Sequence, residues 1–168
     1  SSINSYTIET NSNFNRFSGN DKLDNSKRVD LSFGIKNNNF DGLLWQSYEF
    51  TNNSNYHYSQ GNEKKLNDIL GNINLKIHNL NNGYSFRYDH HKDYLKSQTY
   101  DLGYKNILGE YKFSYLDQKS KTDEIITTDN ETLQYRYDSN KIFKYSKISY
   151  YGLYDIKNSA NTESVIEY

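Results

Sequence analysis

The sequence contains no cysteine, no proline and no methionine. The lack of cysteine excludes disulfide frameworks and thiolate metal sites. The lack of proline leaves nothing to interrupt a long ladder of strand hydrogen bonds. There is also no run of about 20 apolar residues, which excludes membrane-spanning helices but not spanning strands. The first ten residues lack the basic and apolar regions of a signal peptide, so we expect the chain to be processed or cut from something longer.

Apolar residues are too few to fill an ordinary soluble core. Only 34% of the 168 residues are hydrophobic even when the 18 tyrosines are counted, and the mean hydropathy is -1.03. Such values are typical of disorder, but aromatic residues make up 16% of the chain and recur at regular spacing. A membrane-spanning β-barrel satisfies both observations, because its apolar residues face lipid while its interior is polar. The formal charge of -1 leaves no basic footprint, so we predict no nucleic-acid partner.

Apolar and polar residues alternate along most of the chain. In the segment 28–36 every second residue is apolar, and the same period recurs near residues 75, 86, 102, 113 and 135. A period of two gives each strand one apolar and one polar face. We therefore predict an all-β fold over residues 1–168, an antiparallel up-and-down transmembrane β-barrel of about ten strands or a fragment of a larger barrel. The predicted strands are 3–16, 27–36, 40–53, 69–79, 84–90, 98–105, 109–118, 131–138, 142–156 and 162–168.

The connections between these strands alternate in length. Asn-rich and Gly-containing segments at 37–39, 81–83, 105–108 and 139–141 are predicted tight turns, because Asn and Gly tolerate the positive φ of hairpin turns. The segments 18–26, 53–68, 91–97 and 119–130 are longer and polar. Outer-membrane barrels have short periplasmic turns at one end and long loops at the other, so we expect the two sets at opposite ends.

The alternation also predicts which residues face which side. The predicted lipid-facing residues are Val29, Leu31, Phe33, Ile35, Leu75, Ile77, Phe86, Phe113 and Tyr135. The predicted lumen-facing residues are Arg28, Asp30, Lys76, Arg87, Lys112 and Arg136. Tyrosines flank the apolar centres near strand ends, as expected of an aromatic girdle at the headgroup level.

Two segments carry a family resemblance. TYDLGYKNILGEYKFSYLDQKS, residues 99–120, and KISYYGLYDIKNSANTESVIEY, residues 147–168, resemble hairpins in the C-terminal barrel of the outer-membrane lipopolysaccharide-assembly family LptD/OstA. The matching elements are the strand 150–158 and the strand 163–168, which ends in Glu-Tyr. The family often continues with Cys-Trp, whereas this chain has no cysteine and its one tryptophan is Trp45.

The resemblance implies a location and a function. It implies a non-enzymatic conduit in the outer membrane of a Gram-negative cell that takes part in lipopolysaccharide assembly, with a periplasmic bridge and a plug lipoprotein as partners. The polar lumen would pass the sugar and phosphate part of the lipid. Because the family barrel has more than ten strands, the chain would be a fragment of it.

One cluster of titratable groups could carry chemistry. Asp89-His90-His91-Lys92-Asp93 contains an Asp-His pair that could activate a water, as in omptin-type surface proteases, which resemble this chain in having ten strands. A second carboxylate pair should then face it, and Asp123-Glu124 is the candidate. A solvated loop explains the same residues. Metal binding by His90 and His91 is disfavoured because adjacent strand residues point to opposite faces, and His57 and His78 are isolated. We predict no catalytic residues, no metal and no cofactor.

Two other functions fit the same sequence. One is a small ten-stranded outer-membrane barrel acting as a passive pore or a surface protease. The other is a secreted, soluble β-sheet protein of adhesin type, in which tyrosine ladders stack across strands. Dependence on detergent separates the membrane readings from the soluble one.

Overall fold

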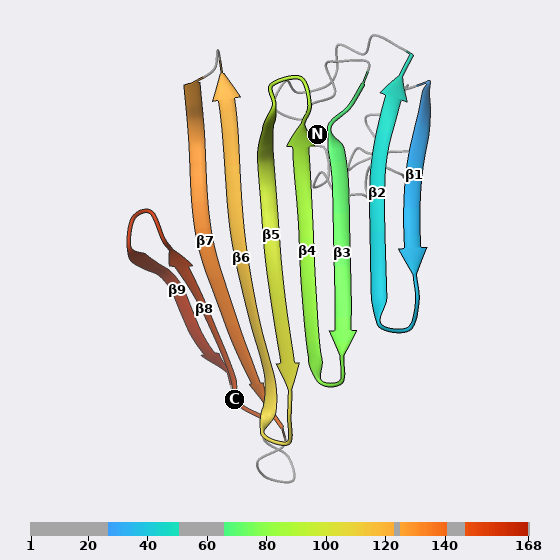
Figure 1. The fold of residues 1–168 in the computed structure, drawn as a ribbon. Helices are drawn as coiled ribbons and strands as arrows, with labels where there is room; N and C mark the ends of the chain where they lie inside the picture. The colour runs from blue at the N-terminus through green and yellow to red at the C-terminus, as the bar shows by residue number, and fades with distance from the viewer. Residues whose placement is uncertain (1–26, 51–65, 123–124, 141–146, 168) are drawn as a thin grey trace.

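The computed structural model describes residues 27–50, 66–122, 125–140 and 147–167, and within them every regular element is a β-strand. The strands form one nine-stranded sheet in which each pairs with the next along the chain, always antiparallel (Figure 1). They are β1 (Arg28–Lys36), β2 (Phe40–Glu49), β3 (Ile69–Ile77), β4 (Leu80–Asp89), β5 (Tyr94–Lys105), β6 (Gly109–Thr122), β7 (Ile125–Ser139), β8 (Ser149–Asp155) and β9 (Ala160–Glu167).

The predicted antiparallel all-β architecture is confirmed for the described residues. The predicted strand at 3–16 lies outside the described residues. None of the described segments forms a helix that is long and apolar enough to cross a membrane.

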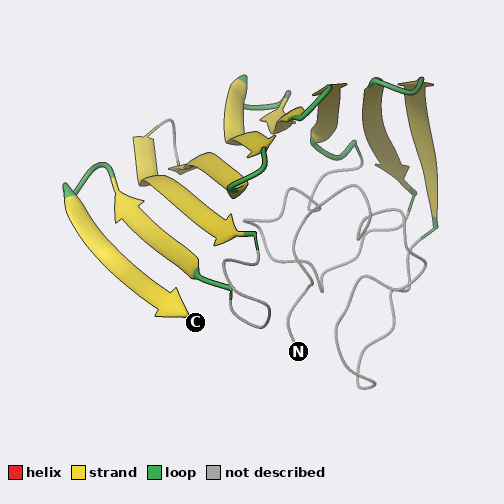
Figure 2. Ribbon diagram, turned by 90° about the horizontal axis from the view of Figure 1, so that it is seen from below, coloured by secondary structure: helices red, strands yellow, loops and turns green. Residues whose placement is uncertain are grey.

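The sheet is curved but open. Seen along the strands in Figure 2, the nine strands follow an arc whose first and last members lie at opposite ends. β1 and β9 each pair with one neighbour only, so among the described strands the predicted closure into a barrel is not present.

Two of the predicted tight turns are confirmed. The Oδ1 atom of Asn37 accepts hydrogen bonds from the backbone N–H groups of Asn39 and Phe40, both at 2.8 Å. The Oδ1 atom of Asn106 does the same for Leu108 at 2.8 Å and Gly109 at 3.1 Å. In both cases a short amide side chain replaces a backbone acceptor and closes the turn. Of the predicted turn at 139–141, Ser139 ends β7 and Asn140 follows it, whereas Lys141 and most of the β7–β8 connection lie outside the described residues.

The predicted turn at 81–83 was wrong. The β3–β4 connection is the two-residue turn His78-Asn79, in which His78 has a φ of 51°. Asn81 and Asn82 are instead paired in the ladder, opposite Lys76 and Leu75. Three consecutive turn-forming residues hid a strand, because pairing outweighs the local preference of Asn.

Two predicted long connections are also shorter than expected. β5 begins at Tyr94, inside the predicted connection 91–97, and β6 and β7 together occupy nearly all of 119–130. This stretch is charged and polar on both faces, so the alternation that reveals a half-buried strand is absent.

Hydrophobic burial in this sheet is sparse. Among the described residues only Trp45 and Leu70 are buried hydrophobic side chains. Many large apolar side chains are exposed instead, for example Leu31 and Phe33 at 66% and Phe113 at 47%. The sheet therefore has no internal apolar core of the kind that stabilises a soluble domain.

Candidate functional site: an apolar face and a polar trough

The pairing register assigns each strand residue to one of two faces. Partners in an antiparallel pair share a face, and successive residues alternate between faces. Followed from β1 to β9, one face carries most of the apolar and aromatic side chains and is called the apolar face here. The opposite one is the polar face. Its apolar and aromatic exceptions are Leu43, Trp45, Leu70, Tyr94, Leu116, Ile125, Tyr151, Leu153, Ala160 and Val165.

All nine residues predicted to face lipid lie on the apolar face. Phe33 is linked to Phe86 through the partners Leu44 and Gly71, and Leu75 is linked to Phe113 and Tyr135 through the row that crosses β4 and β5. All six residues predicted to face a lumen lie on the polar face, since Lys76, Lys112 and Arg136 are one position out of step with that row. Contact of these faces with lipid or with a lumen stays a prediction.

Tyrosine side chains form two ladders across the apolar face. In the first, the Tyr84 and Tyr100 ring centroids are 4.5 Å apart and those of Tyr100 and Tyr115 are 6.2 Å apart. In the second, Tyr104 and Tyr111 are 6.4 Å apart and Tyr111 and Tyr137 are 4.8 Å apart. Leu102 and Phe113 pair between the ladders. Such cross-strand aromatic pairs add stability beyond the area they bury.

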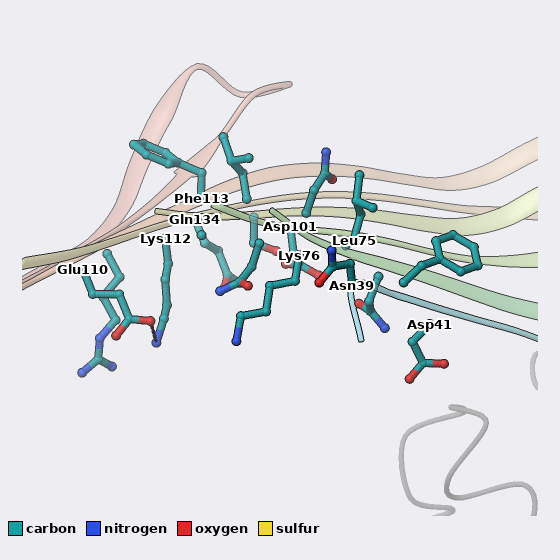
Figure 3. Close-up of a pocket in the computed structure, with 18 of the residues that line it drawn as sticks. Asn39, Asp41, Leu75, Lys76, Asp101, Glu110, Lys112, Phe113 and Gln134 are labelled. Atoms are coloured by element: carbon teal, nitrogen blue, oxygen red, sulfur yellow. Dashed lines mark ion pairs between the residues drawn. The ribbon is translucent and has the colours of Figure 1, made fainter. Parts of the chain in front are cut away.

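A trough lies on the polar face near the tight-turn end. It encloses about 820 Å³ and draws its lining from seven strands, β2 to β8, together with the end of β1 and the turn 37–39. In Figure 3 Lys76, Glu110, Lys112 and Gln134 project to one side of the sheet, whereas Phe113 projects to the other. Three of the six predicted lumen-facing residues line it, namely Lys76, Lys112 and Arg136.

The trough is polar and nearly balanced in charge. Its lining includes four basic and three acidic side chains: Lys36, Lys76, Lys112, Arg136, Asp41, Asp101 and Glu110. Lys112 pairs with Glu110 at 3.1 Å, and Arg136 pairs with Asp138 at 2.8 Å. Within the described part of the chain, the side chains of Lys76 and Asp101 have no hydrogen-bond or ion-pair partner. The trough thus offers both donors and acceptors to water or a polar solute.

The other three predicted lumen-facing residues lie toward the loop end. Arg28 pairs with Asp30 at 3.2 Å. Arg87 belongs to a buried ion network, in which its Nε lies 2.6 Å from Asp68, while Lys96 Nζ lies 3.0 Å from both Asp68 and Asp89. Lys96 is the extra residue of the irregularity between Arg87 and Tyr88, which was not anticipated from the sequence.

The segment 89–93 forms part of this loop-end structure. The Asp89 carboxylate accepts hydrogen bonds from the backbone N–H groups of His91 and Lys92 at 2.9 and 3.1 Å. Burial raises the pKa of Asp89, but hydrogen bonds from these groups and the hydrogen bond and charge of Lys96 outweigh it and lower the pKa overall. The Asp93 carboxylate accepts a hydrogen bond from the Tyr88 hydroxyl.

Metal binding by His90 and His91 was disfavoured on the premise that both lie in a strand with side chains on opposite faces, and this premise was wrong. Both lie in a turn rather than a strand, and their ring centroids are 3.8 Å apart. His91 Nε2 is 2.9 Å from the carbonyl oxygen of Leu66, so a backbone group occupies this nitrogen. The predicted facing pair Asp123-Glu124 and the isolated His57 lie outside the described residues.

A charged group on the apolar face was missed by sequence reasoning. The carboxylates of Asp117, Asp129 and Glu131 have oxygens within 4.8 Å of one another. Lys119 lies 2.9 Å from Asp117, and Lys157 forms an ion pair with Asp129. We call these five residues the rim cluster. Lys119 and Asp129 fall in the connection predicted at 119–130, whereas Asp117 and Glu131 fall in predicted strands. The two-residue spacing of Asp117 and Lys119, and of Asp129 and Glu131, was the signal that they share one face of a hairpin.

Comparison with known proteins supplies no relative for this chain. No protein-family model matches it. No curated protein and no solved structure matches it either. The resemblance to the lipopolysaccharide-assembly family therefore stays a prediction from residues 99–120 and 147–168.

Proposed function

We propose that the described sheet is part of the wall of an outer-membrane β-barrel, with its apolar face against lipid and its polar face lining a hydrated lumen. The barrel acts as a non-enzymatic conduit. The single observation that carries the proposal is the segregation of side chains, by which an exposed apolar face is backed by a polar trough across the same strands.

The exposed apolar area is the physical reason for a membrane. Monomeric soluble proteins rarely expose contiguous apolar patches beyond a few hundred Å². Here apolar side chains at least 36% exposed occur on the apolar face of β1 to β6, including Leu31, Ile73, Leu80, Leu102 and Phe113. Lipid removes this area from water without a second protein layer, and it accepts a sheet whose opposite face is wet.

The cargo follows from the sequence resemblance alone. A member of the lipopolysaccharide-assembly family would pass the saccharide and phosphate part of the lipid along the polar face. The trough supports this proposal by its polar lining of basic, acidic and amide side chains, with Lys76, Asp101 and Gln134 among them. The proposed partners are membrane lipid and lipopolysaccharide, together with a periplasmic bridge and a plug lipoprotein.

Two adjacent substitutions test the proposed sidedness. Phe113 lies on the apolar face and the neighbouring Ser114 lies on the polar face and lines the trough. Phe113→Arg should destabilise the chain folded in lipid vesicles by roughly 2–4 kcal/mol, because it places a cation in the hydrocarbon. Ser114→Arg should cost far less, since its side chain enters a hydrated space. Reversible urea unfolding of both variants measures the difference.

Two results would overturn the proposal. Equal losses of stability at positions 113 and 114 would mean that the two faces meet similar surroundings. A chain that stays folded and monomeric in buffer without detergent or lipid would favour the secreted soluble sheet.

A further inference from the structure

The boundary of the apolar face does not run parallel to the rows of paired residues. One such row can be followed across seven strands from partner to partner: Phe33, Leu44, Gly71, Phe86, Gln98, Asp117 and Glu131. The row begins with apolar residues on β1 to β4, becomes polar on β5 and is charged on β6 and β7. Residues in one row of paired partners therefore suit different surroundings, apolar on β1 to β4 and polar or charged on β5 to β7.

The charged residues of the apolar face are confined to one place. In the described strands this face carries no Asp, Glu, Lys, Arg or His on β1 to β5, β8 or β9, while β6 and β7 contribute Asp117, Lys119, Lys121, Asp129 and Glu131. This part of the hairpin also extends beyond its neighbours, because the pairing of β6 with β5 stops at Gln118 and that of β7 with β8 at Thr132.

The upper margin of the apolar face lies lower at β6 than at β1, and most of the drop falls between β5, where Leu95 still pairs with Tyr88, and β6. On β1 apolar residues continue up to Val29, whereas on β6 the last one is Tyr115, immediately below Asp117. Tyr115 lies in the row of Ile35, which is six residues beyond Val29. At about 3.4 Å per residue the margin descends by roughly 20 Å.

The lower margin descends in the same direction. The β1–β2 turn is the polar segment 37–39, whereas the β5–β6 turn contains Ile107 and Leu108, which are 90% and 62% exposed. Figure 1 shows the β5–β6 turn well below the β1–β2 turn when the strands are upright. Because both margins move together, the apolar face is a slanted band.

We infer that the bilayer crosses the sheet along this band, so that the strands are tilted by roughly 40° and the rim cluster stands at the lipid headgroups. From β1 to β6 the sheet is five strand spacings wide, or roughly 24 Å, and a descent of roughly 20 Å over that width gives the angle. A tilt of about 35–45° is what spanning barrels adopt. The occupant of the band is lipid, because charge is excluded from the band and begins at its margin.

The inference rests on the proposed function, and it adds a prediction about membrane depth that the proposed function alone does not make. Under the inference, residues 33 and 131 share a row but lie at different depths, Phe33 in the hydrocarbon and Glu131 at or above the headgroups. Six strand spacings at this tilt separate their depths by roughly 15–20 Å. A bilayer parallel to the rows would place the two residues at equal depth.

Depth-dependent quenching measures this separation. The chain has no cysteine, so Phe33→Cys, Glu131→Cys and the central Phe113→Cys each give one site for a bimane label. The labelled chains are folded into phosphatidylcholine vesicles that contain lipids brominated at different positions along the acyl chain. Ser114→Cys, on the polar face, is the matched control that acyl-chain bromine should not quench.

The possible outcomes distinguish the slanted band from the proposed function. We expect acyl-chain bromine to quench the labels at 33 and 113 at least severalfold more than the label at 131, which aqueous iodide should quench instead. Equal depth for 33 and 131, with 113 in the acyl chains, would refute the slant and leave the proposed function standing. Protection of all three labels from acyl-chain bromine would refute both.

Discussion

Replacing Gly71 by alanine should destabilise the protein although the change adds a single methyl group. Gly71 lies on β3 between Leu44 of β2 and Phe86 of β4, on the apolar face. A Cβ atom at this position would lie 2.3 Å from Phe86 Cε1, 2.5 Å from Phe86 Cζ and 3.0 Å from Leu44 Cδ2. The Phe86 ring covers the glycine, and Leu44 on the other side prevents the added methyl group from moving away from the ring.

The magnitude follows from two opposing terms. Forcing a methyl group into an occupied site typically costs about 1–3 kcal/mol. Alanine also restricts the unfolded chain, which returns about 0.4–1 kcal/mol. We therefore expect Gly71→Ala to lose about 1–2 kcal/mol of unfolding free energy.

Gly103 is the matched control. It is also a strand glycine, but its added Cβ would meet nothing closer than Asn81 Cβ at 3.7 Å, so Gly103→Ala should be neutral or slightly stabilising. Urea unfolding in vesicles can be followed through Trp45, the only tryptophan, which is buried. In a Phe86→Ala background the penalty of Gly71→Ala should largely disappear. Equal effects at Gly71 and Gly103, or no coupling to Phe86, would refute the reasoning.

Three further changes test other parts of the sheet. Gly152→Ala should also cost about 1–2 kcal/mol, because its Cβ would lie 2.2 Å from Tyr135 Cζ; the same unfolding assay with Tyr135→Ala as second substitution measures the coupling, and additivity would contradict the contact. Lys96→Met should lower the free energy of unfolding by about 3 kcal/mol because it removes the partner of buried Asp89. Lys112→Met, the control, breaks an exposed ion pair and should cost under about 1 kcal/mol. Similar losses for the two variants would contradict burial of the network. Because the folded chain lowers the pKa of Asp89, the ionised carboxylate stabilises the fold fully above its ordinary pKa of 3.8, and this stabilisation is lost as pH falls through the lower folded pKa. Acid unfolding of Asp89→Asn should therefore depend less on pH below about 4 than that of the parent chain. An unchanged pH dependence would refute the assignment.

The sequence was informative wherever one face of a strand is apolar. The alternation in 28–36 and around Phe113 placed β1 and β6 correctly and assigned their residues to the right groups, because a period of two admits only one partition of a strand. It failed where both faces are polar. Between 119 and 130 a charged hairpin has no apolar period, so its pairing could not be distinguished from a loop.

Features that depend on neighbouring strands were also beyond sequence reasoning. The position of the turn at His78-Asn79 depends on pairing between Asn82 and Leu75, which no local preference reveals. The irregularity that directs Lys96 toward Asp68 and Asp89 arises from one extra residue in β5, and its effect requires the register of β4. The trough combines residues from strands separated by more than 100 positions, from Lys36 to Tyr151.

Under the proposed function, the pairing order limits how a barrel wall containing this sheet can be completed. In an antiparallel meander alternate strands run the same way, so β1 and β9, the first and last of the nine described strands, both run toward the tight-turn end. Joining these two edges directly would create a parallel seam in an otherwise antiparallel sheet. A second copy of the nine strands in the same membrane orientation would create two such seams, because each copy would present two edges of equal direction. An odd number of additional antiparallel strands avoids every parallel seam and keeps the apolar face continuous. The strand predicted at 3–16 is one candidate for such an addition, and a larger barrel would satisfy the same rule with any odd number of added strands.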